Sequence, residues 1–430
     1  MPEQAALKLN EKSVSGDGER LVFGSMVGSG GEGTVWRIQN RPDIAVKLYS
    51  ESMRTDERAA KLRAMIANPP PGTTRRGHRS IAWPARLVVD RSGRVAGFTM
   101  SLVSNAKELA SIINPRSRAA IAPGMTWRHA LNIARNVSSV VAALHVSGYV
   151  VGDLSDHNFL VTDDGLVTLI DCDSLQVPNP AGGAFVSTVG TVRFTAPELL
   201  GIDFASQQRT PEGDRFALAT LIFLLLFEGY HPFQGVPASK DFGGDDLSAI
   251  RSGAFAHSSS QSILTPPPAA PSFASLPAVL AQQFERTFIR GHLDPSLRVH
   301  ADAWQSSLDS VLRSLQVCRR EPQHVFWSVD QACPWCARAQ SIGVDTWTLR
   351  PRTPAVPSTF TSTQKTATGT PPGTVRSTPR PSLQSPPPPP PARAVPNSGN
   401  SVLTLSVVGA VLLIGFLFVT LQLLVSAGLR

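Results

Sequence analysis

The chain has 430 residues, more than a single domain usually contains, so two or more structural units are expected. Hydrophobic residues make up 42% of the composition, which is enough for a globular core. The formal net charge is +8, but seven basic residues and no acidic residue lie between 346 and 430, and without them 33 basic residues face 32 acidic ones. The remainder is nearly neutral, which argues against a nucleic-acid-binding protein.

The chain begins with a polar stretch, residues 1–20, which lacks the apolar core of a secretory signal peptide and is predicted to be a mobile lead-in. Leu21–Ile38 then alternates apolar and polar residues around a glycine cluster, which predicts two strands joined by a tight turn. Gly28, Gly30 and Gly33 have G-x-G-x-x-G spacing, which lets a backbone approach phosphate groups closely. Dinucleotide-binding folds share this spacing but continue into a helix. Here the strand-like residues TVWRI follow, so a phosphate-covering hairpin is favoured.

Asp43–Tyr49 is predicted to be the next strand, and it carries Lys47 within an apolar run, where a lysine requires an ionic partner. Arg54–Ile66 has a helical pattern in which Glu57 is the only glutamate. Glu57 is either that partner or a solvated surface residue. A further strand is expected at Gly97–Val103, and a long amphipathic helix at Met125–Ser147.

The most informative stretch is Tyr149–Asp173, a short loop followed by two predicted strands. Asp153, Asn158 and Asp171 are spaced so that a chain reversal brings them to one edge. A carboxylate and an amide there provide oxygen ligands for a divalent cation, and the second carboxylate can orient a hydroxyl for attack on phosphorus. The alternative is an acidic hairpin with solvated turns.

Downstream, the loop Ser174–Thr195 leads into Ala196-Pro197-Glu198, and Asp214–Gly229 is apolar on nearly every face. That segment predicts a buried helix, because its apolar run of 11 residues is too short to span a bilayer. Two more amphipathic helices are predicted at Pro277–Arg290 and Ala301–Leu315.

Seven motifs of residues 20–315 occur in the order found in eukaryotic-like (Hanks-type) Ser/Thr protein kinases, which this region resembles. They include the glycine loop, Ala45-Val46-Lys47, G-D-L-S-D-H-N, the metal-binding Asp171, G-T-x-x-F-x-A-P-E, His231-Pro232-Phe233 and L-D-P-S-L-R. The resemblance implies an α+β, bilobal protein kinase fold over residues 21–315, with a small β-rich lobe and a larger helical lobe.

The resemblance also implies the roles of individual residues. Lys47 would grip the ATP phosphates and pair with Glu57, Asp153 would act on the substrate hydroxyl, and Asn158 with Asp171 would hold Mg²⁺ or Mn²⁺. Asp214 would cap its helix and fix the catalytic loop, and Arg298 would form a buried ion pair with Glu198. The remaining nucleotide contacts would come from Gly28, Ser29, Gly30, Gly33, Val35, Ala45, Met100, Ser101 and Val103.

The chain departs from the family pattern at several positions. Val151-Gly152 replaces the usual His-Arg, whose arginine reads an activation-loop phosphate, so the loop with its natural phosphosites Ser187 and Thr188 is not expected to require phosphorylation. Ser155 replaces a lysine, and Asp171-Cys172-Asp173 replaces Asp-Phe-Gly.

These departures leave two alternatives to a protein kinase. One is a non-catalytic or weakly active nucleotide-binding scaffold, which conflicts with the presence of Lys47, Asp153, Asn158 and Asp171. The other is a small-molecule phosphotransferase, since the G-D-L-S-D-H-N loop also looks like those of aminoglycoside kinases. The A-P-E segment and Arg298 favour a protein substrate.

Residues 316–345 contain Cys318, His324, Cys333 and Cys336 in C-x5-H-x8-C-x2-C spacing. Three thiolates and an imidazole form a closed tetrahedral set, which predicts a structural zinc knuckle in a reducing compartment; free thiols are the alternative. A kinase followed by C-P-W-C resembles a bacterial subgroup encoded beside von Willebrand factor A and phosphatase proteins in tellurite-resistance-type clusters. Those proteins are expected partners.

The last segments predict a membrane tether. Residues 346–400 are rich in Pro, Ser and Thr and are expected to form an extended linker. Val402–Val425 contains 24 residues without a charge, which predicts a single transmembrane helix over 401–427 rather than a buried soluble helix. Basic residues before the span favour an inner-membrane protein with a cytoplasmic kinase domain.

Overall fold

The computed structural model describes residues 14–15, 21–72, 74–75, 77–239, 245–259, 263–328 and 332–349. All of them belong to one compact unit, Met1–Val356. Most of the predicted lead-in and linker, and all of the predicted transmembrane helix over 401–427, lie outside the described residues. Within the described part, no helix combines the length and apolar character that crossing a membrane requires.

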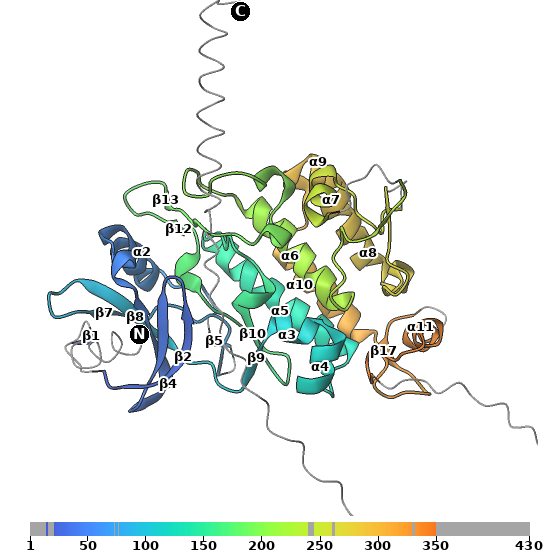
Figure 1. Ribbon diagram of the computed structural model, residues 1–430, viewed down its shortest axis with the longest axis horizontal. Helices are drawn as coiled ribbons and strands as arrows, with labels where there is room; N and C mark the ends of the chain where they lie inside the picture. The colour runs from blue at the N-terminus through green and yellow to red at the C-terminus, as the bar shows by residue number, and fades with distance from the viewer. Residues whose placement is uncertain are drawn as a thin grey trace, which may run out of the picture. The chain divides into compact units, whose positions relative to one another are not determined.

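The small lobe is an antiparallel sheet of six strands with the order β1-β7-β8-β4-β3-β2 (Figure 1). The sheet strands are β1 (Val14–Ser15), β2 (Phe23–Gly30), β3 (Gly33–Ile38), β4 (Arg41–Tyr49), β7 (Arg86–Val89) and β8 (Val95–Ser101). A short 3₁₀ turn, η1 (Glu51–Met53), leads into helix α2 (Asp56–Ala67), which contacts β7 and β8. The strand–turn–strand predicted at 21–38, the strand at 43–49 and the helix at 54–66 are thus confirmed.

The two faces of β4 have different surroundings, as the alternation of side chains along a strand requires. Val46 and Leu48 belong to a small apolar cluster of this lobe together with Phe23. Lys47 and Tyr49 point to the opposite face, toward the larger lobe. The register places Lys47 opposite Val35 of β3 and Phe98 of β8, so the lysine lies in the middle of the sheet.

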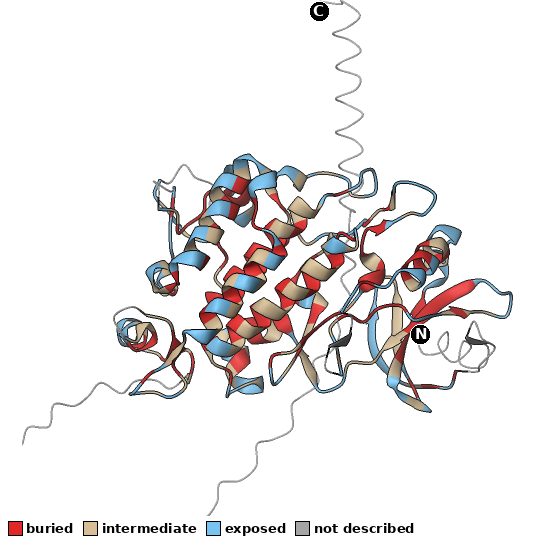
Figure 2. Ribbon diagram, turned by 180° about the vertical axis from the view of Figure 1, so that it is seen from behind, coloured by how far each residue is buried: buried red, intermediate tan, exposed pale blue. Residues whose placement is uncertain are grey.

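The large lobe is built mainly from helices around α5 (Trp127–Val146) and α6 (Pro211–Leu226). Every residue of α6 from Phe216 to Leu226 is buried, which explains why this segment is apolar on all faces (Figure 2). The other helices are α3 (Leu109–Ile113), α4 (Pro115–Ile121), α7 (Asp246–Ser252), α8 (Ala278–Glu285), α9 (Gly291–Leu293) and α10 (Ala301–Arg313). Helix α10 packs against α5, and α5 packs against α6.

The predicted helix at 277–290 is not α-helical throughout. Its regular part ends at Glu285 and continues as a π-helical turn, η7 (Arg286–Arg290). Within this turn the Thr287 hydroxyl accepts a hydrogen bond from the backbone N–H of Val299. The widened turn therefore connects α8 to the segment that carries Arg298.

Short elements support the loops of the cleft. A three-stranded sheet contains β9 (Ala106–Glu108), β10 (Phe159–Thr162) and β11 (Val167–Leu169). The small remaining elements are β5 (Thr74–Arg75), β6 (His78–Arg79), η2 (Asp156–Asn158), η3 (Cys172–Ser174), β12 (Val177–Pro178), β13 (Ala184–Phe185), η4 (Val192–Phe194), η5 (Pro197–Leu199), β14 (Val236–Pro237), β15 (Leu264–Thr265), η6 (Phe273–Ser275) and η8 (Pro295–Leu297).

After α10 the chain forms a hairpin of β16 (Gln316–Val317) and β17 (Val325–Phe326), followed by α11 (Pro334–Ile342). This segment packs against the helices of the large lobe. The Trp335 ring meets the Trp127 ring of α5 edge-on at 5.7 Å between centroids. Glu228, buried two residues after the end of α6, binds both Arg118 and Arg338. Removal of residues 316–349 would therefore expose apolar surface and leave a buried carboxylate with only one of these arginine partners.

Candidate active site

A cavity of about 560 Å³ lies between the glycine loop and the catalytic loop. That volume is typical of a small-molecule site. The predicted site residues that line it are Gly28, Ser29, Gly30, Gly33, Val35, Lys47, Asp153, Asn158 and Asp171. Ala45, Met100, Ser101 and Val103 are not among its lining residues, although Ala45 pairs with Met100 across β4 and β8. An adenine contact by these four residues stays a prediction.

The glycine loop needs glycine most at Gly33. A Cβ there would lie 2.0 Å from the Leu48 carbonyl oxygen, so any side chain would force β3 away from β4. A Cβ at Gly28 or Gly30 would meet nothing within 4 Å, and both positions border the cavity. At the tip, Glu32 accepts two hydrogen bonds of 2.9 Å from Arg58 of α2, which lower its pKa. The loop is therefore tied to the helix.

The catalytic loop, Gly152–Asn158, is held by Asp214, as predicted from the sequence. Its carboxylate accepts hydrogen bonds from the backbone N–H groups of Val151 (2.7 Å) and Gly152 (2.8 Å) and contacts His145. Asp214 lies in the first turn of α6, which begins at Pro211, so Asp214 does not cap the helix and that detail of the prediction is wrong.

Asp153 and Asn158 are linked directly. The Asn158 amide nitrogen donates to the Asp153 backbone carbonyl at 2.7 Å, which leaves the amide oxygen available as a ligand. One Asp153 carboxylate oxygen accepts a hydrogen bond of 2.7 Å from the Thr191 hydroxyl. The carboxylate thus already holds a hydroxyl group beside the cavity, which is the interaction expected between a catalytic aspartate and a substrate hydroxyl.

Asp171 follows β11 and adopts a left-handed backbone conformation (φ 57°), which few residues other than glycine, Asn and Asp adopt readily. Its side chain is 54% exposed and accepts a hydrogen bond of 3.1 Å from Lys47. Asn158 and Asp171 both line the cavity and offer oxygen atoms, so the pair fits a Mg²⁺ ion. A bound Mg²⁺ would neutralise charge on the phosphates.

The pairing of Lys47 with Glu57 is wrong. Glu57 lies in the first turn of α2 and is exposed, and no ion pair joins it to Lys47 among the described residues. Lys47 instead donates a 2.8 Å hydrogen bond to Asp173, besides its contact with Asp171. Burial lowers the pKa of Lys47, but the charges of Asp173 and Asp171 outweigh this and raise it above its ordinary value.

The error amounts to one turn of helix. Glu57 lies in the exposed first turn of α2, and the buried residue on the same face lies four positions further along the chain. That inward position holds Lys61, which is 9% exposed and lines a small cavity with Arg58 and Asp173. The helix therefore presents a cation where a carboxylate was expected. The clue in the sequence was Asp173 itself, an acidic residue in place of the glycine of Asp-Phe-Gly.

A second missed residue, Arg209, occupies the space that Gly152 leaves open. Its guanidinium donates to the backbone carbonyls of Gly152 (2.9 Å), Ser187 (2.8 Å) and Val189 (2.7 Å). A Cβ at Gly152 would lie 2.4 Å from Arg209, and its φ of 76° also favours glycine. Arg209 is 5% exposed and stacks on Phe204. The loop around Ser187 is thus bound to the catalytic loop through neutral oxygens.

The predicted ion pair between Arg298 and Glu198 is confirmed. The guanidinium binds both carboxylate oxygens, at 2.6 and 2.7 Å, and also donates to the Gly291 carbonyl. Arg298 is fully buried, whereas the Glu198 side chain is 36% exposed. The pair connects the A-P-E segment to the π-helical turn and α9.

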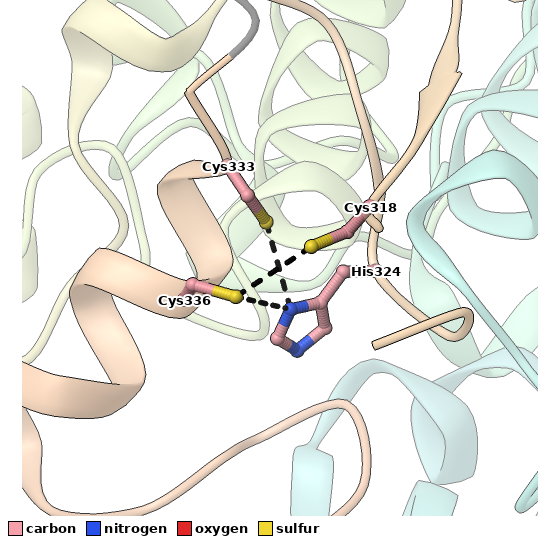
Figure 3. A group of neighbouring side chains, drawn as sticks. All are labelled: Cys318, His324, Cys333 and Cys336. Carbon is pink, nitrogen blue, oxygen red and sulfur yellow. Dashed lines mark hydrogen bonds between the residues drawn. The ribbon is translucent and has the colours of Figure 1, made fainter. Parts of the chain in front are cut away.

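A separate cluster brings together Cys318, His324, Cys333 and Cys336 (Figure 3). Cys318 and His324 come from the β16–β17 turn, and both other cysteines from the start of α11. The Cys318 and Cys336 sulfurs are 3.7 Å apart, and His324 Nδ1 lies 3.5 and 3.4 Å from the Cys333 and Cys336 sulfurs. A tetrahedral zinc site has edges of ~3.8 Å between sulfurs and ~3.5 Å from sulfur to nitrogen. The four donors fit zinc.

Asp345 completes this cluster and was not singled out from the sequence. Its carboxylate lies 3.0 Å from His324 Nε2 and also accepts from the Trp347 backbone N–H. A proton on Nε2 directs the lone pair of Nδ1 toward the three sulfurs, which is how metal-binding histidines are oriented.

Comparisons with known proteins agree with this geometry. The protein kinase domain family matches residues 21–268. Protein kinase YegI of Escherichia coli (strain K12) is 34% identical over 342 residues, 77% of this chain and 51% of YegI. Serine/threonine-protein kinase PknA of Mycobacterium tuberculosis (strain ATCC 25177 / H37Ra) is 26% identical over 285 residues, 64% of this chain and 56% of PknA. The chain thus spans about half the length of the curated relatives it matches.

Among solved structures, the ROP18 kinase domain in complex with AMP-PNP and sucrose is 19% identical, with a TM-score of 0.46 over 70% of this chain and 84% of that one. At this TM-score the likeness adds nothing to the assignment. The two lobes and the cleft between them are those of the protein kinase fold. The chain belongs to the protein kinase family, which implies ATP and Mg²⁺ as its ligands.

Proposed function

We propose that the chain is a protein serine/threonine kinase that transfers the γ-phosphate of ATP to hydroxyl groups of other proteins. The observation that carries this proposal is the grouping of Lys47, Asp153, Asn158 and Asp171 around one cavity. Each residue has the chemical group that its role requires: an ammonium for phosphate, a carboxylate for the hydroxyl, and two oxygen ligands for the metal. A non-catalytic scaffold would not need all four.

Specificity for serine and threonine is supported by the Thr191 hydroxyl on Asp153, since the same carboxylate oxygen can accept an aliphatic substrate hydroxyl. The A-P-E segment, fixed by Arg298, offers a platform for a polypeptide. The mycobacterial relative is a serine/threonine kinase by its name.

The test uses the full chain purified in detergent, with labelled ATP, Mg²⁺ and a generic protein substrate. Replacement of the metal ligand by Asp171→Asn should lower turnover by at least about 1,000-fold, because phosphate charge is no longer neutralised. Asp246→Asn, on the surface of α7, is the matched control and should leave turnover unchanged. Wild-type turnover in the Asp171→Asn variant would refute the assignment, as would an inactive wild-type protein.

We further propose that residues 316–349 hold one structural zinc ion. Cys333→Ser should lower the zinc content and reduce the midpoint of thermal unfolding by roughly 5–10 °C, because the hairpin and α11 lose their common ligand. Cys172→Ala removes a buried thiol outside the cluster and should retain zinc. Elemental analysis that finds no zinc in the wild-type protein would end this proposal.

We propose a membrane-tethered kinase of bacterial signalling or stress response. The uncharged stretch Val402–Val425 supports an inner-membrane anchor, and the basic linker before it supports a cytoplasmic kinase domain. The resemblance to the C-P-W-C subgroup supports von Willebrand factor A and phosphatase proteins as partners. Fractionation of cells that express the full chain, with a variant truncated after residue 400 as the control, tests the anchor.

Control of the kinase is proposed not to depend on phosphorylation of the loop Ser174–Thr195. The support is Arg209, which binds the Ser187 and Val189 carbonyls without any phosphate. Activity would then be governed by where the kinase is held and by its partners.

A further inference from the structure

The carboxylate of Asp173 is buried beside the cleft, and both of its oxygens accept hydrogen bonds. It is 4% exposed; one oxygen accepts from Lys47 at 2.8 Å and the other accepts from the Tyr49 hydroxyl at 2.8 Å. Arg58 of α2 lies 3.8 Å away. Lys47 and Tyr49 are two residues apart and face the same side of β4, so Asp173 binds two successive positions on one face of the strand that carries the lysine.

Among the described residues, no carboxylate of helix α2 forms an ion pair with Lys47. At its inward-facing position, Lys61 forms no hydrogen bond or ion pair with any residue that the structure describes, although it is nearly buried. A lysine there would repel Lys47 if nothing negative lay between them. Asp173 is the largest favourable charge acting on Lys61, so this carboxylate also offsets the helix cation.

We propose that Asp173 is the positioning residue for Lys47, and that it replaces the helix glutamate that other protein kinases use. This rests on the proposed phosphotransfer function. Asp173 belongs to the 3₁₀ turn η3, which directly follows Asp171. One short segment therefore supplies both the metal ligand and the carboxylate that aligns the lysine.

The arrangement has a consequence for how the cleft is assembled. In kinases that rely on a helix glutamate, the lysine is aligned only when the helix has moved into place. Here alignment of Lys47 follows from the placement of η3, because Asp171 and Asp173 contact the same ammonium at 3.1 and 2.8 Å. A change in the position of α2 would disturb the Glu32–Arg58 pair, and with it the 3.8 Å contact between Glu32 and Lys47, but leave the hydrogen bonds of Lys47 to Asp171 and Asp173 intact.

The test relocates the carboxylate in the full chain. Asp173→Asn should lower kcat/KM for ATP by about 50-fold, less than the loss found when a donor that touches the reacting group is removed, because Asp173 acts through Lys47. Adding Lys61→Glu, which places a carboxylate on α2, should recover at least about tenfold of this loss. The matched control Lys61→Gln removes the cation without adding a carboxylate and should recover less than about threefold.

A second measurement does not depend on turnover. Thermal unfolding without nucleotide is compared for Lys47→Met, Asp173→Asn and the double variant. If the two residues form one pair, the double variant should lose less stability than the sum of the single variants. An inactive wild-type protein would refute the proposed function, and this cycle would still decide the pairing.

Three results would overturn the proposal. The first is an Asp173→Asn variant with wild-type kcat/KM for ATP. The second is equal recovery by Lys61→Gln and Lys61→Glu, which would show that the helix cation, not the missing carboxylate, limits the variant. The third is strict additivity in the unfolding cycle, which would mean that Asp173 only supports the local fold.

Discussion

Two regions of the cleft lack a charged residue that protein kinases usually have, and each region is rebuilt differently. Near β4, the helix glutamate is absent and Asp173 supplies a carboxylate from another segment. At the catalytic loop, the arginine is absent and Arg209 enters the space above Gly152. The first region retains an ion pair, whereas in the second a cation donates its hydrogen bonds to neutral carbonyl oxygens.

The difference follows from what each partner is. Lys47 is 8% exposed in its side chain, and a buried ammonium is costly unless a charged group faces it. Without a glutamate from α2, Lys47 therefore needs a carboxylate from another segment, and Asp173 provides it. The arginine of the catalytic loop normally meets a phosphate that is added after synthesis, so a loop held through its own backbone can dispense with both charges. Under the proposals above, the first region preserves a mechanism and the second removes a requirement for phosphorylation of the loop.

The largest expected effect comes from breaking the second region. Arg209→Ala should lower kcat by about 100-fold, equivalent to ~2.7 kcal/mol, because three backbone carbonyls lose their donor and the loop carrying Thr191 is released. The loop 174–195 should also become sensitive to limited proteolysis.

Arg209→Lys provides the graded comparison, since an ammonium cannot reach three divergent carbonyls with the same geometry. Arg251→Ala, on the exposed side of α7, is the control and should behave as wild type. Full activity together with a protease-resistant loop in Arg209→Ala would show that the guanidinium is not the anchor.

A smaller effect is expected in the first region, from the helix cation. Burial lowers the pKa of Lys61 to about 8, with Asp173 acting in the opposite direction. Because this pKa is below that of an unfolded lysine, the unfolded chain binds more protons between about pH 8 and 10.5, and stability rises with pH in that window. Lys61→Met should lack this rise, a difference on the order of 1 kcal/mol.

The measurement is chemical denaturation of both proteins at pH 8 and pH 10. The charged groups nearest to Lys61 are Asp173, Arg58, Glu32 and Glu57. Identical pH dependence in the two proteins would indicate that Lys61 is solvated, and the contrast between the regions would then rest on Asp173 alone.

The smallest effect concerns phosphorylation. Ser187 is buried, and its hydroxyl has no hydrogen-bond partner among the described residues, whereas Thr188 is exposed. The double variant Ser187→Ala, Thr188→Ala should change the initial rate by less than about threefold, equivalent to ~0.7 kcal/mol. The rate is measured against wild type on one protein substrate. A hundredfold loss would show that a phosphate activates the loop after all, with Arg209 as its natural receptor.

Much of the cleft was predictable because its residues are close in sequence or have fixed spacing. Asp153 and Asn158 are separated by one loop, and the glycine loop is a single hairpin. The Glu198–Arg298 pair was also predicted, although 100 positions separate its members. That success came from two motifs that the family resemblance connects, because no local pattern links the residues.

By itself, the sequence determined the order of the strands and helices, the all-buried character of α6, the four residues around the cavity and the four members of the Cys₃His cluster. These depend on periodicity, spacing and residue chemistry, which are local properties of the chain. Tertiary structure alone decided which residues bind Lys47 and which fill the space at Gly152. Lys47 and Asp173 are 126 positions apart, and Arg209 lies 57 positions from Gly152. Glu57 was expected to pair with Lys47, but the buried residue on that face of α2 is Lys61, one turn further along the helix, and the carboxylate comes from Asp173. Spacing along the chain shows which partners are available, whereas the burial of a charge selects the one that is close enough to neutralise it.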